Sequence, residues 1–449
     1  MKRKLKSIIA TLVATVFGVF LGAPGVSAAN PYGIQYSGGE ELGASNLQVA
    51  PEKVAGLTEL VRGSADGSNV IFAPSTKWEQ GYQFIYNTCY PVHYFRVWDG
   101  FSMSPTDVLS YAVTNGKYTE TVSIQNIVLD GLTNVTEDNA MAVIVEGDGA
   151  ISARRAIYSD STCQTAVSNV KSWGPAAANS GKLFVQANIR IVENAKFAVF
   201  TSDELYFAFN DVDAAQSYKI LNADSLLTKN NMFVKNAEAF QSPDFTYKNM
   251  YSASGNYIYS QFNPSLDPVM MNLQNDDNVI FVKLGTATQT EGLNVVFGFA
   301  AQAGSNVMFY AQQYQVVYTS DDYGEITGLK DEIVVAGKNP TGSEQKPNED
   351  YVFSHWIADV DVTLKDGTKI KAGDEITSEQ ILDVVVDKNI KFTAIHVTES
   401  DIVVPNTGVF TGSNNAALTT MLLAPVVLII VLAIYGYNRK KIVVKFDKK

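Results

Sequence analysis

The chain is poor in the residues that most often carry catalysis and metal binding. Its 449 residues include only 2 cysteines and 3 histidines. His93 lies alone in an aromatic stretch, His355 adjoins Trp356, and His396 ends a predicted strand. The sequence also lacks Gly-x-Ser-x-Gly, His-Glu-x-x-His, Cys-x-x-Cys and phosphate-binding glycine-loop patterns. These absences argue against the common nucleophilic, zinc-dependent and nucleotide-dependent enzymes.

Positive charge is also scarce. The chain has 34 basic and 46 acidic residues, a net charge of −12, and much of the positive charge lies at its two ends. Without residues 1–28 and those after Thr407, 24 basic and 45 acidic residues remain, a net charge of −21. Nucleic acids and anionic membrane surfaces are bound through clustered Lys and Arg. We therefore expect no nucleic-acid partner.

The N-terminus has the pattern of a secretory signal peptide. Basic residues fall within positions 2–6, an apolar run extends over residues 8–21, and Val26-Ser27-Ala28 supplies small residues. A basic start, a short apolar core and a small-x-Ala site are the three parts of such a signal. A retained membrane helix is disfavoured because the apolar core is short. We expect signal peptidase to cleave after Ala28, which makes residues 1–28 the signal peptide.

The C-terminal end predicts a membrane span. Residues 416–437 form an apolar stretch, and a basic tail follows over residues 438–449. A helix of about 22 residues at 1.5 Å per residue just crosses a hydrocarbon core of ~30 Å. Basic residues beside a span favour the cytoplasmic side. We expect the body of the chain outside the cell, and the tail inside.

A pentapeptide lies a few residues before this span, within a polar linker over residues 400–415. It reads Val404-Pro405-Asn406-Thr407-Gly408. Pro-Asn-Thr-Gly alone is also an ordinary turn sequence. Followed by an apolar helix and a basic tail, however, the pentapeptide resembles the LPxTG cell-wall sorting signal of Gram-positive surface proteins. Two departures are the Val404 in place of leucine and the long tail.

The resemblance implies attachment by a sortase. The enzyme would cleave between Thr407 and Gly408 and transfer the Thr407 carboxylate to an amine of the cell wall or of a pilin. Simple retention by the membrane helix is the alternative. In both cases the protein is expected at the cell wall or cell membrane, on the extracellular face.

The two cysteines, Cys89 and Cys163, are interpreted in the light of export. A single disulfide between them is the simplest reading in an oxidising compartment. It would close a loop of about 75 residues, for which the chain-entropy model gives roughly 4 kcal/mol. Two free buried thiols are the alternative.

Residues 29–312 mainly show a period of two. Apolar and polar residues alternate over residues 183–192, which predicts a half-buried strand with one mainly polar face. Asn115-Gly116 stands between two alternating runs, a strong hairpin signal. Further strands are expected over residues 278–284 and 293–297, and a short amphipathic helix over residues 51–61. The pattern predicts a mainly β fold, with a large antiparallel β-sandwich region of one or two domains.

A smaller unit is predicted over residues 313–399. Strand patterns there are joined by an Asp366-Gly367 hairpin and by a short helix, which a Thr377/Gln380 capping box would open. This order predicts a β-grasp-like fold.

Aromatic positions in this unit carry a second resemblance. Tyr351, Phe353 and Trp356, with the closing Phe392-Thr393-Ala394-Ile395, resemble the Listeria-Bacteroides and internalin-type B repeat modules of surface proteins. The likeness covers about a fifth of the chain. It implies a spacer that lifts a distal domain off the wall, and Trp356 is then expected in its core.

Few candidate binding sites stand out in the outer region. Asp211 and Asp213 follow a strand-like run, and alternate side chains of an extended chain point the same way. They are the candidate Ca²⁺ ligands, although the EF-hand loop is absent and acidic turns are common. No other metal or cofactor is expected. The aromatic residues between 245 and 262 predict either sandwich core or an exposed binding patch.

Three functions follow from this architecture. The first is an adhesin-like surface protein whose outer β-sandwich binds an unidentified extracellular ligand. The second is an anchored enzyme acting on glycans, which needs two carboxylates at a set separation. The third is a pilin or coat subunit joined to its neighbours by sortase. We expect the first, and no catalytic residues, because the enzyme patterns named above are absent.

Overall fold

A computed structural model describes residues 26–27, 30–35, 40–41, 48–85, 87–102, 108–173, 181–210, 216–222, 231–234, 249–251, 257–260, 279–300 and 302–398. Several predicted features lie outside these residues: the cleavage residue Ala28, the pair Asp211 and Asp213, the sorting motif at 404–408, and the span and tail at 416–449. In the described part, none of the helices is long and apolar enough to cross a membrane.

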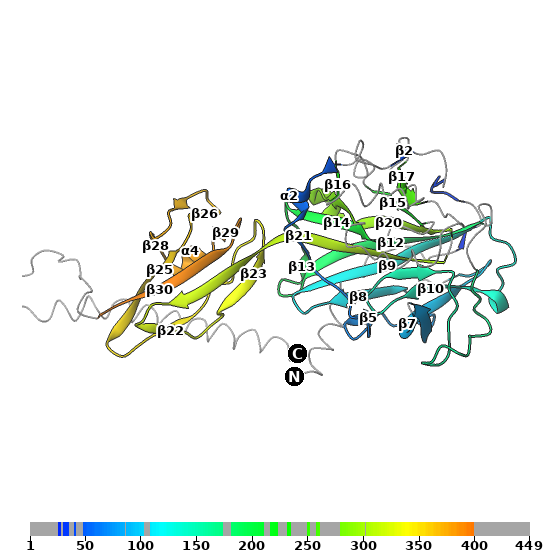
Figure 1. Cartoon of the computed structure of the whole chain (residues 1–449), viewed down its shortest axis with the longest axis horizontal. Helices are drawn as coiled ribbons and strands as arrows, with labels where there is room; N and C mark the ends of the chain where they lie inside the picture. Colours follow the sequence, from blue (N-terminus) through cyan, green and yellow to red (C-terminus); the bar gives the residue numbers. More distant parts are fainter. Residues whose placement is uncertain are drawn as a thin grey trace, which may run out of the picture. The chain divides into compact units, whose positions relative to one another are not determined.

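The fold is mainly β and has a sandwich-like arrangement of large sheets (Figure 1). The first sheet has the strand order β2 (Glu40–Glu41), β17 (Asn249–Tyr251), β18 (Tyr257–Ser260), β15 (Gln216–Ile220), β20 (Leu293–Phe299), β12 (Lys182–Glu193), β9 (Tyr118–Asp130), β8 (Ser110–Thr114) and β5 (Val70–Phe72). β1 (Val26–Ser27) pairs with β9, and β13 (Ala198–Val199) pairs with β12.

The second sheet continues into the C-terminal part of the described chain. Its order is β3 (Gln48–Val49), β16 (Met232–Val234), β19 (Ile280–Lys283), β14 (Leu205–Asn210), β21 (Ala303–Ser320), β11 (Ile151–Ala153), β10 (Met141–Val145), β7 (Thr88–Val97) and β6 (Glu79–Ile85). Most neighbouring strands in both sheets are antiparallel, as the sequence predicts. The short helical segments are α2 (Pro51–Val54), η1 (Glu137–Asn139), α3 (Thr286–Glu291) and α4 (Ser378–Ile381).

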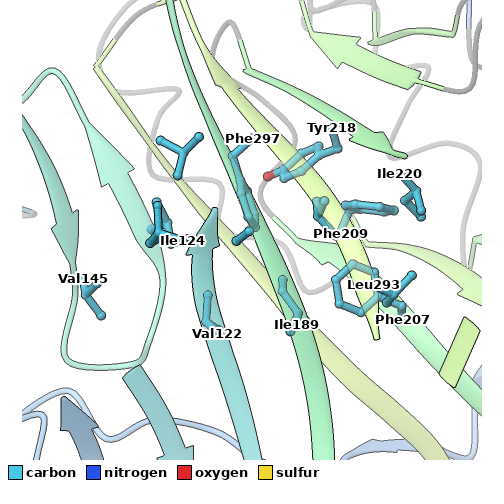
Figure 2. Packing of buried hydrophobic residues seen from close by; sticks show 14 of the residues in the cluster. Val122, Ile124, Val145, Ile189, Phe207, Phe209, Tyr218, Ile220, Leu293 and Phe297 are labelled. Atoms are coloured by element: carbon cyan, nitrogen blue, oxygen red, sulfur yellow. The ribbon is translucent and has the colours of Figure 1, made fainter. Parts of the chain in front are cut away.

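The main core lies between the apolar faces of the two sheets. Figure 2 shows Val122, Ile189 and Phe297 of the first sheet together with Phe207 and Phe209 of the second. Phe297, Phe207 and Phe209 are all 0% exposed. Full burial of one such side chain contributes about 1.5–3 kcal/mol. Hydrophobic burial therefore holds the two sheets together.

β12 is buried on both of its faces, which corrects the prediction of one mainly polar face. Phe184 is 0% exposed and packs in a second cluster outside the main core. Asn188 is also buried, and its Nδ2 donates to Oδ1 of Asn294 at 2.8 Å. Asn188 is thus satisfied by a residue of the neighbouring strand β20, and the segments that contribute Tyr32 and Tyr257 cover Phe184.

The helix predicted over residues 51–61 is wrong beyond its first turn. α2 ends at Val54, and residues Leu57–Glu59 form β4, which pairs with β21 at residues 310–312. Backbone groups of β21 supply the hydrogen-bond partners there, and tertiary pairing overrides a weak helical preference.

The Asn115-Gly116 turn is confirmed as the hairpin between β8 and β9. Asn115 Oδ1 accepts hydrogen bonds from the backbone N–H groups of Lys117 and Tyr118, at 3.1 and 2.9 Å. Gly116 has a φ of 89°, a conformation that glycine adopts without strain.

The C-terminal part of the described chain has its own core, which contains Trp356, Phe392 and Ile390. Its remaining strands are β22 (Gly324–Ile326), β23 (Asp331–Val335), β24 (Gln345–Pro347), β25 (Tyr351–Ala358), β26 (Val362–Leu364), β27 (Lys369–Ile370), β28 (Glu375–Ile376), β29 (Val384–Val385) and β30 (Ile390–Thr398). β21, yellow-green in Figure 1, supplies residues to this core and to the main core. The boundary predicted at 312/313 thus falls inside a continuous strand.

The capping box that opens α4 is confirmed. Thr377 Oγ1 accepts from the N–H of Gln380, and the Gln380 side chain accepts from the N–H of Thr377. Trp356 is 1% exposed, and its Nε1 donates to Ser378 Oγ at 3.1 Å. The tryptophan is therefore a core residue whose one polar atom is satisfied.

Candidate functional site

A groove of about 420 Å³ lies where the two large sheets end, between β5, the last strand of the first sheet, and β6, the last strand of the second. We call it the edge groove. The side chains most relevant to binding come from five separate segments: Asp66, Phe72, Gln80, Tyr82, His93 and Ser159. Such a concave surface with a few polar groups is the usual form of a ligand site.

A stacked pair of rings forms part of the groove lining. The rings of Phe72 and His93 lie with their centroids 3.9 Å apart, and Trp78 meets Phe72 edge-on at 4.9 Å. Gln80 Nε2 is 3.1 Å from His93 Nε2. Since an amide nitrogen only donates, the imidazole nitrogen accepts this bond. Burial lowers the pKa of His93, so the ring is neutral at neutral pH.

Asp66 contributes a permanent negative charge to the edge groove. Its Oδ1 accepts from the backbone N–H of Ser68 at 3.0 Å. Hydrogen bonds from the Ser64 side chain and from Ser68 lower the pKa of Asp66 to about 2. Among the described lining residues, two are acidic, Asp66 and Glu146, and none is Lys or Arg. The groove therefore has an acidic character.

A disulfide-bonded segment, residues 156–166, closes one side of the groove; we call it the strap. Tyr158 exchanges two backbone hydrogen bonds of 2.8 Å with Tyr82 on the edge strand β6. Cys163 is joined to Cys89 on β7, with the two Cα atoms 5.8 Å apart. This is the pairing that the sequence favours. The strap thus holds Ser159 in the groove lining.

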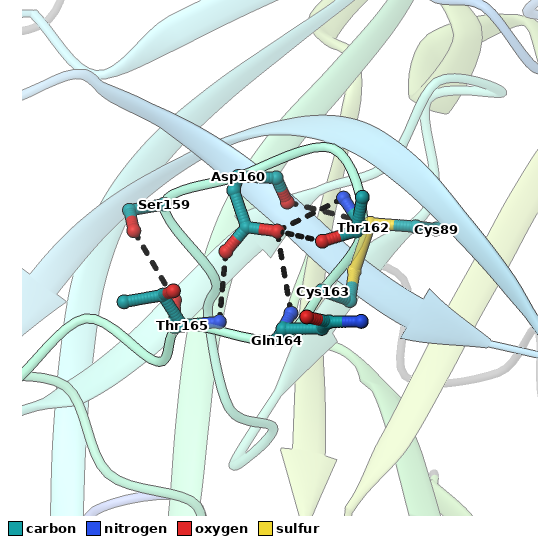
Figure 3. The surroundings of a disulfide bond; sticks show 7 residues. All are labelled: Cys89, Ser159, Asp160, Thr162, Cys163, Gln164 and Thr165. Carbon is teal, nitrogen blue, oxygen red and sulfur yellow. Dashed lines mark hydrogen bonds between the residues drawn. A yellow bond between two sulfur atoms is a disulfide. The ribbon is translucent and has the colours of Figure 1, made fainter.

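Asp160 orders the turn of the strap beside the disulfide (Figure 3). Its carboxylate accepts from the hydroxyl of Thr162 and from the backbone N–H groups of Thr162, Gln164 and Thr165. These bonds, that of the Thr162 hydroxyl foremost, lower the pKa of Asp160. A carboxylate that accepts several local hydrogen bonds favours one turn conformation.

Two acids lie away from the edge groove, inside the sandwich. Burial raises the pKa of Glu59 to about 7, and it raises the pKa of Glu120 well above its ordinary value. Repulsion from Glu59 adds to the raised pKa of Glu120, and repulsion from Asp148 adds to that of Glu59. Neither acid was predicted as a site residue from the sequence. The available signal in the sequence was the position of Glu120 on the apolar face of the alternating run 118–124.

The histidines have different surroundings. His396 is buried, and its Nδ1 lies 2.7 Å from Asp321 Oδ1 while its Nε2 lies 3.0 Å from Gln345 Oε1. Hydrogen bonds from His396 lower the pKa of Asp321, although burial acts in the opposite direction. His396 is therefore a structural residue, and only His93 lines the edge groove.

The candidate Ca²⁺ ligands Asp211 and Asp213 and the sorting motif at 404–408 lie outside the described residues. Between residues 245 and 262, the described residues Tyr257 and Ile258 are buried in core clusters. Within the described ranges, no group of three or more His, Cys, Asp and Glu side chains is placed to hold a metal ion. Sequence reasoning missed Asp66, Gln80, Tyr82 and Ser159, because they belong to segments that meet only in the folded chain.

Comparisons with known proteins add little to these observations. No protein-family model and no curated protein sequence matches the chain. Among solved structures, the N-terminal domain of the Streptococcus gordonii adhesin Sgo0707 is similar at 11% identity and a TM-score of 0.37, with 75% of this chain and 83% of that chain covered. A likeness of this size does not establish a shared fold.

Proposed function

We propose that the chain is an adhesin-like cell-surface protein, held at the envelope by its C-terminus, that binds an extracellular ligand in the edge groove. The observation that carries the proposal is the groove itself. It combines the half-buried rings of Phe72, Tyr82 and His93 with the exposed side-chain amide of Gln80 and the ionised carboxylate of Asp66. Its volume is that of a small-ligand site. Part of its lining is held in place by the strap and its disulfide.

The proposal is binding without catalysis. A general acid or base must lie within hydrogen-bond reach of its substrate. Glu59 and Glu120, the acids with raised pKa, do not line the edge groove, and Glu120 is only 6% exposed. The carboxyl group of Asp66 has the opposite character, because its low pKa makes it a poor proton donor.

The anchorage in this proposal rests on the sequence. Signal peptidase would cleave after Ala28, and a sortase would join Thr407 to an amine of the wall or of a pilin. Mass spectrometry of envelope-bound protein tests this step. We expect peptides that end at Thr407 in amide linkage. An intact peptide across Thr407 and Gly408 in nearly all molecules would show that the chain is held by its membrane helix alone.

The binding function is tested by display of the full chain on a non-adherent bacterium. Adhesion is measured on arrays of immobilised glycans and matrix proteins. The double variant Gln80→Ala/Tyr82→Ala removes two groove side chains, and we expect it to lose at least tenfold in adhesion. Phe84→Ala is the matched control, since Phe84 is exposed on the same strand but does not line the groove. Equal adhesion of all three proteins would contradict the proposed site.

A further inference from the structure

We infer that the ligand of the edge groove is an uncharged saccharide, bound by ring stacking and by hydrogen bonds to Asp66 and Gln80. The inference rests on the binding function proposed above and names the ligand class of that site. It follows from the aromatic lining, the polar lining and the charge of the groove.

The aromatic lining suits the apolar face of a sugar ring. Tyr82 is half-buried and lies directly across the β6–β7 ladder from Pro91, which is exposed. The stacked rings of Phe72 and His93 lie in the same groove. The face of an aromatic ring carries partial negative charge. It therefore attracts the C–H groups on one face of a pyranose, while the sugar hydroxyls point outward from the ring edge.

The polar lining suits those hydroxyls. Gln80 is exposed and lines the groove; one N–H of its side-chain amide is directed to His93, and its amide oxygen is a hydrogen-bond acceptor. The Ser159 hydroxyl donates to the Thr165 carbonyl at 3.2 Å, so its oxygen serves as an acceptor. Asp66 adds a carboxylate, the strongest of these acceptors. A ligand rich in O–H donors satisfies this set of acceptors.

The charge of the groove disfavours anionic sugars. Asp66 stays ionised at every physiological pH, and neutral His93 offers no compensating positive charge. Among the described lining residues none is basic. A sialylated, sulfated or phosphorylated ligand would place a second negative charge beside Asp66, and repulsive elements of this kind create specificity. Neutral saccharides avoid this repulsion.

Binding is measured on the full chain by saturation-transfer NMR and calorimetry. The probes are neutral trisaccharides of glucose, galactose and N-acetylglucosamine, with sialyllactose and a lysine-rich peptide for comparison. We expect saturation of the ring protons of at least one neutral trisaccharide, and none for sialyllactose. Tyr82→Ala and Asp66→Asn should each weaken binding about tenfold, equivalent to about 1.4 kcal/mol. Tyr82→Phe, which keeps the ring, should bind nearly as the native chain does.

Three results would overturn the inference, and they differ in what they leave standing. Tighter binding of the lysine-rich peptide, lost in Asp66→Asn, would replace the ligand class but uphold the groove as the site. Absence of transfer to all neutral trisaccharides would reject the saccharide class. Saccharide binding that survives Tyr82→Ala and Asp66→Asn would reject the groove, and with it the proposed function. Phe84→Ala and the melting temperature of each variant control for general effects on folding.

Discussion

At the scale of single residues, the buried acids connect side-chain chemistry to stability. Glu59 Oε2 meets Arg62 Nε at 3.0 Å, whereas its buried Oε1 has no hydrogen-bond partner. Burial favours the neutral form of such a group, and the Arg62 charge offsets this only in part. Glu120 is buried more deeply, close to the backbone of Phe309. Both acids therefore bind a proton more readily in the folded chain than in the unfolded chain.

The pH dependence of stability follows from the raised pKa of Glu59. Because this pKa is about 7 in the folded chain and 4.5 ordinarily, the folded state binds more protons than the unfolded state between these values. The contribution of Glu59 to stability is thus full below pH 4.5 and is lost as the pH rises through 7. The unfolding free energy of the native protein should therefore decrease between pH 5 and pH 8. We expect this decrease to be smaller by about 1–3 kcal/mol in Glu59→Gln.

Urea unfolding of both proteins at pH 5 and pH 8 measures this difference. Glu291→Gln is the control, because Glu291 is an exposed glutamate at the end of α3. An equal pH dependence in native protein and Glu59→Gln would mean that Glu59 is ionised in the folded state.

At the scale of elements, the strap protects an edge of the sandwich. β6 ends the second sheet, and the exposed backbone of an end strand can pair with other chains. Tyr158 occupies this edge at Tyr82, and Ile157 is 0% exposed in a cluster on the outer face of the sheet. The disulfide at Cys163 ties the same segment to β7. The disulfide and the backbone hydrogen bonds of Tyr158 thus hold the strap over the edge of β6.

Removal of the disulfide tests the role of the strap. We expect Cys89→Ser/Cys163→Ser to lower the unfolding free energy by about 2–4 kcal/mol, since the bond closes a long loop. Hydrogen exchange should also become faster at the amides of Tyr82 and Tyr158. Amides in the middle of β12 provide the internal control, and equal acceleration there would indicate a global effect without local release of the strap.

At the scale of the whole molecule, one strand belongs to two cores. The described residues up to Asn348, together with Phe353–His396, group into one compact unit. β21 contributes Phe309 to the main core and Val316 to the C-terminal core. Ser202 links the same two parts, because its hydroxyl donates to the Ala336 carbonyl at 3.2 Å. We therefore interpret the junction as stiff.

Gln289 supports this junction from within. Its side-chain amide accepts from the Ser202 N–H at 2.8 Å and donates to the carbonyls of Ser202 and Leu284. Gln289 is only 4% exposed. We expect Gln289→Ala to lower the unfolding free energy by about 2–3 kcal/mol, because buried backbone groups lose their partners.

Calorimetry checks the size of this loss and the coupling between the two cores. The matched control is Thr290→Ala, an exposed change on the same helix, which should cost less than about 0.5 kcal/mol. Two well-separated transitions in the native chain would contradict a stiff junction.

Local features of the chain were predictable from the sequence. The Asn115-Gly116 hairpin and the Thr377/Gln380 capping box depend on residues only a few positions apart, so their signals are complete within a short window. The partners of β4 lie far along the chain, at residues 310–312. This pairing therefore could not be predicted from residues 51–61 alone. The burial of the outer face of β12 could not be predicted for the same reason, because the segments that cover it are distant in the sequence.

The mainly β character of the chain and its hairpins could be predicted from the sequence, because periodicity and short motifs act locally. The edge groove, the burial of Glu59 and Glu120, and the sharing of β21 between two cores could be recognised only in the folded chain. Each of these depends on burial and charge that arise only when distant segments meet. Asp66, Tyr82 and Ser159 are ordinary residues in the sequence, and their common position in the groove makes them a candidate site.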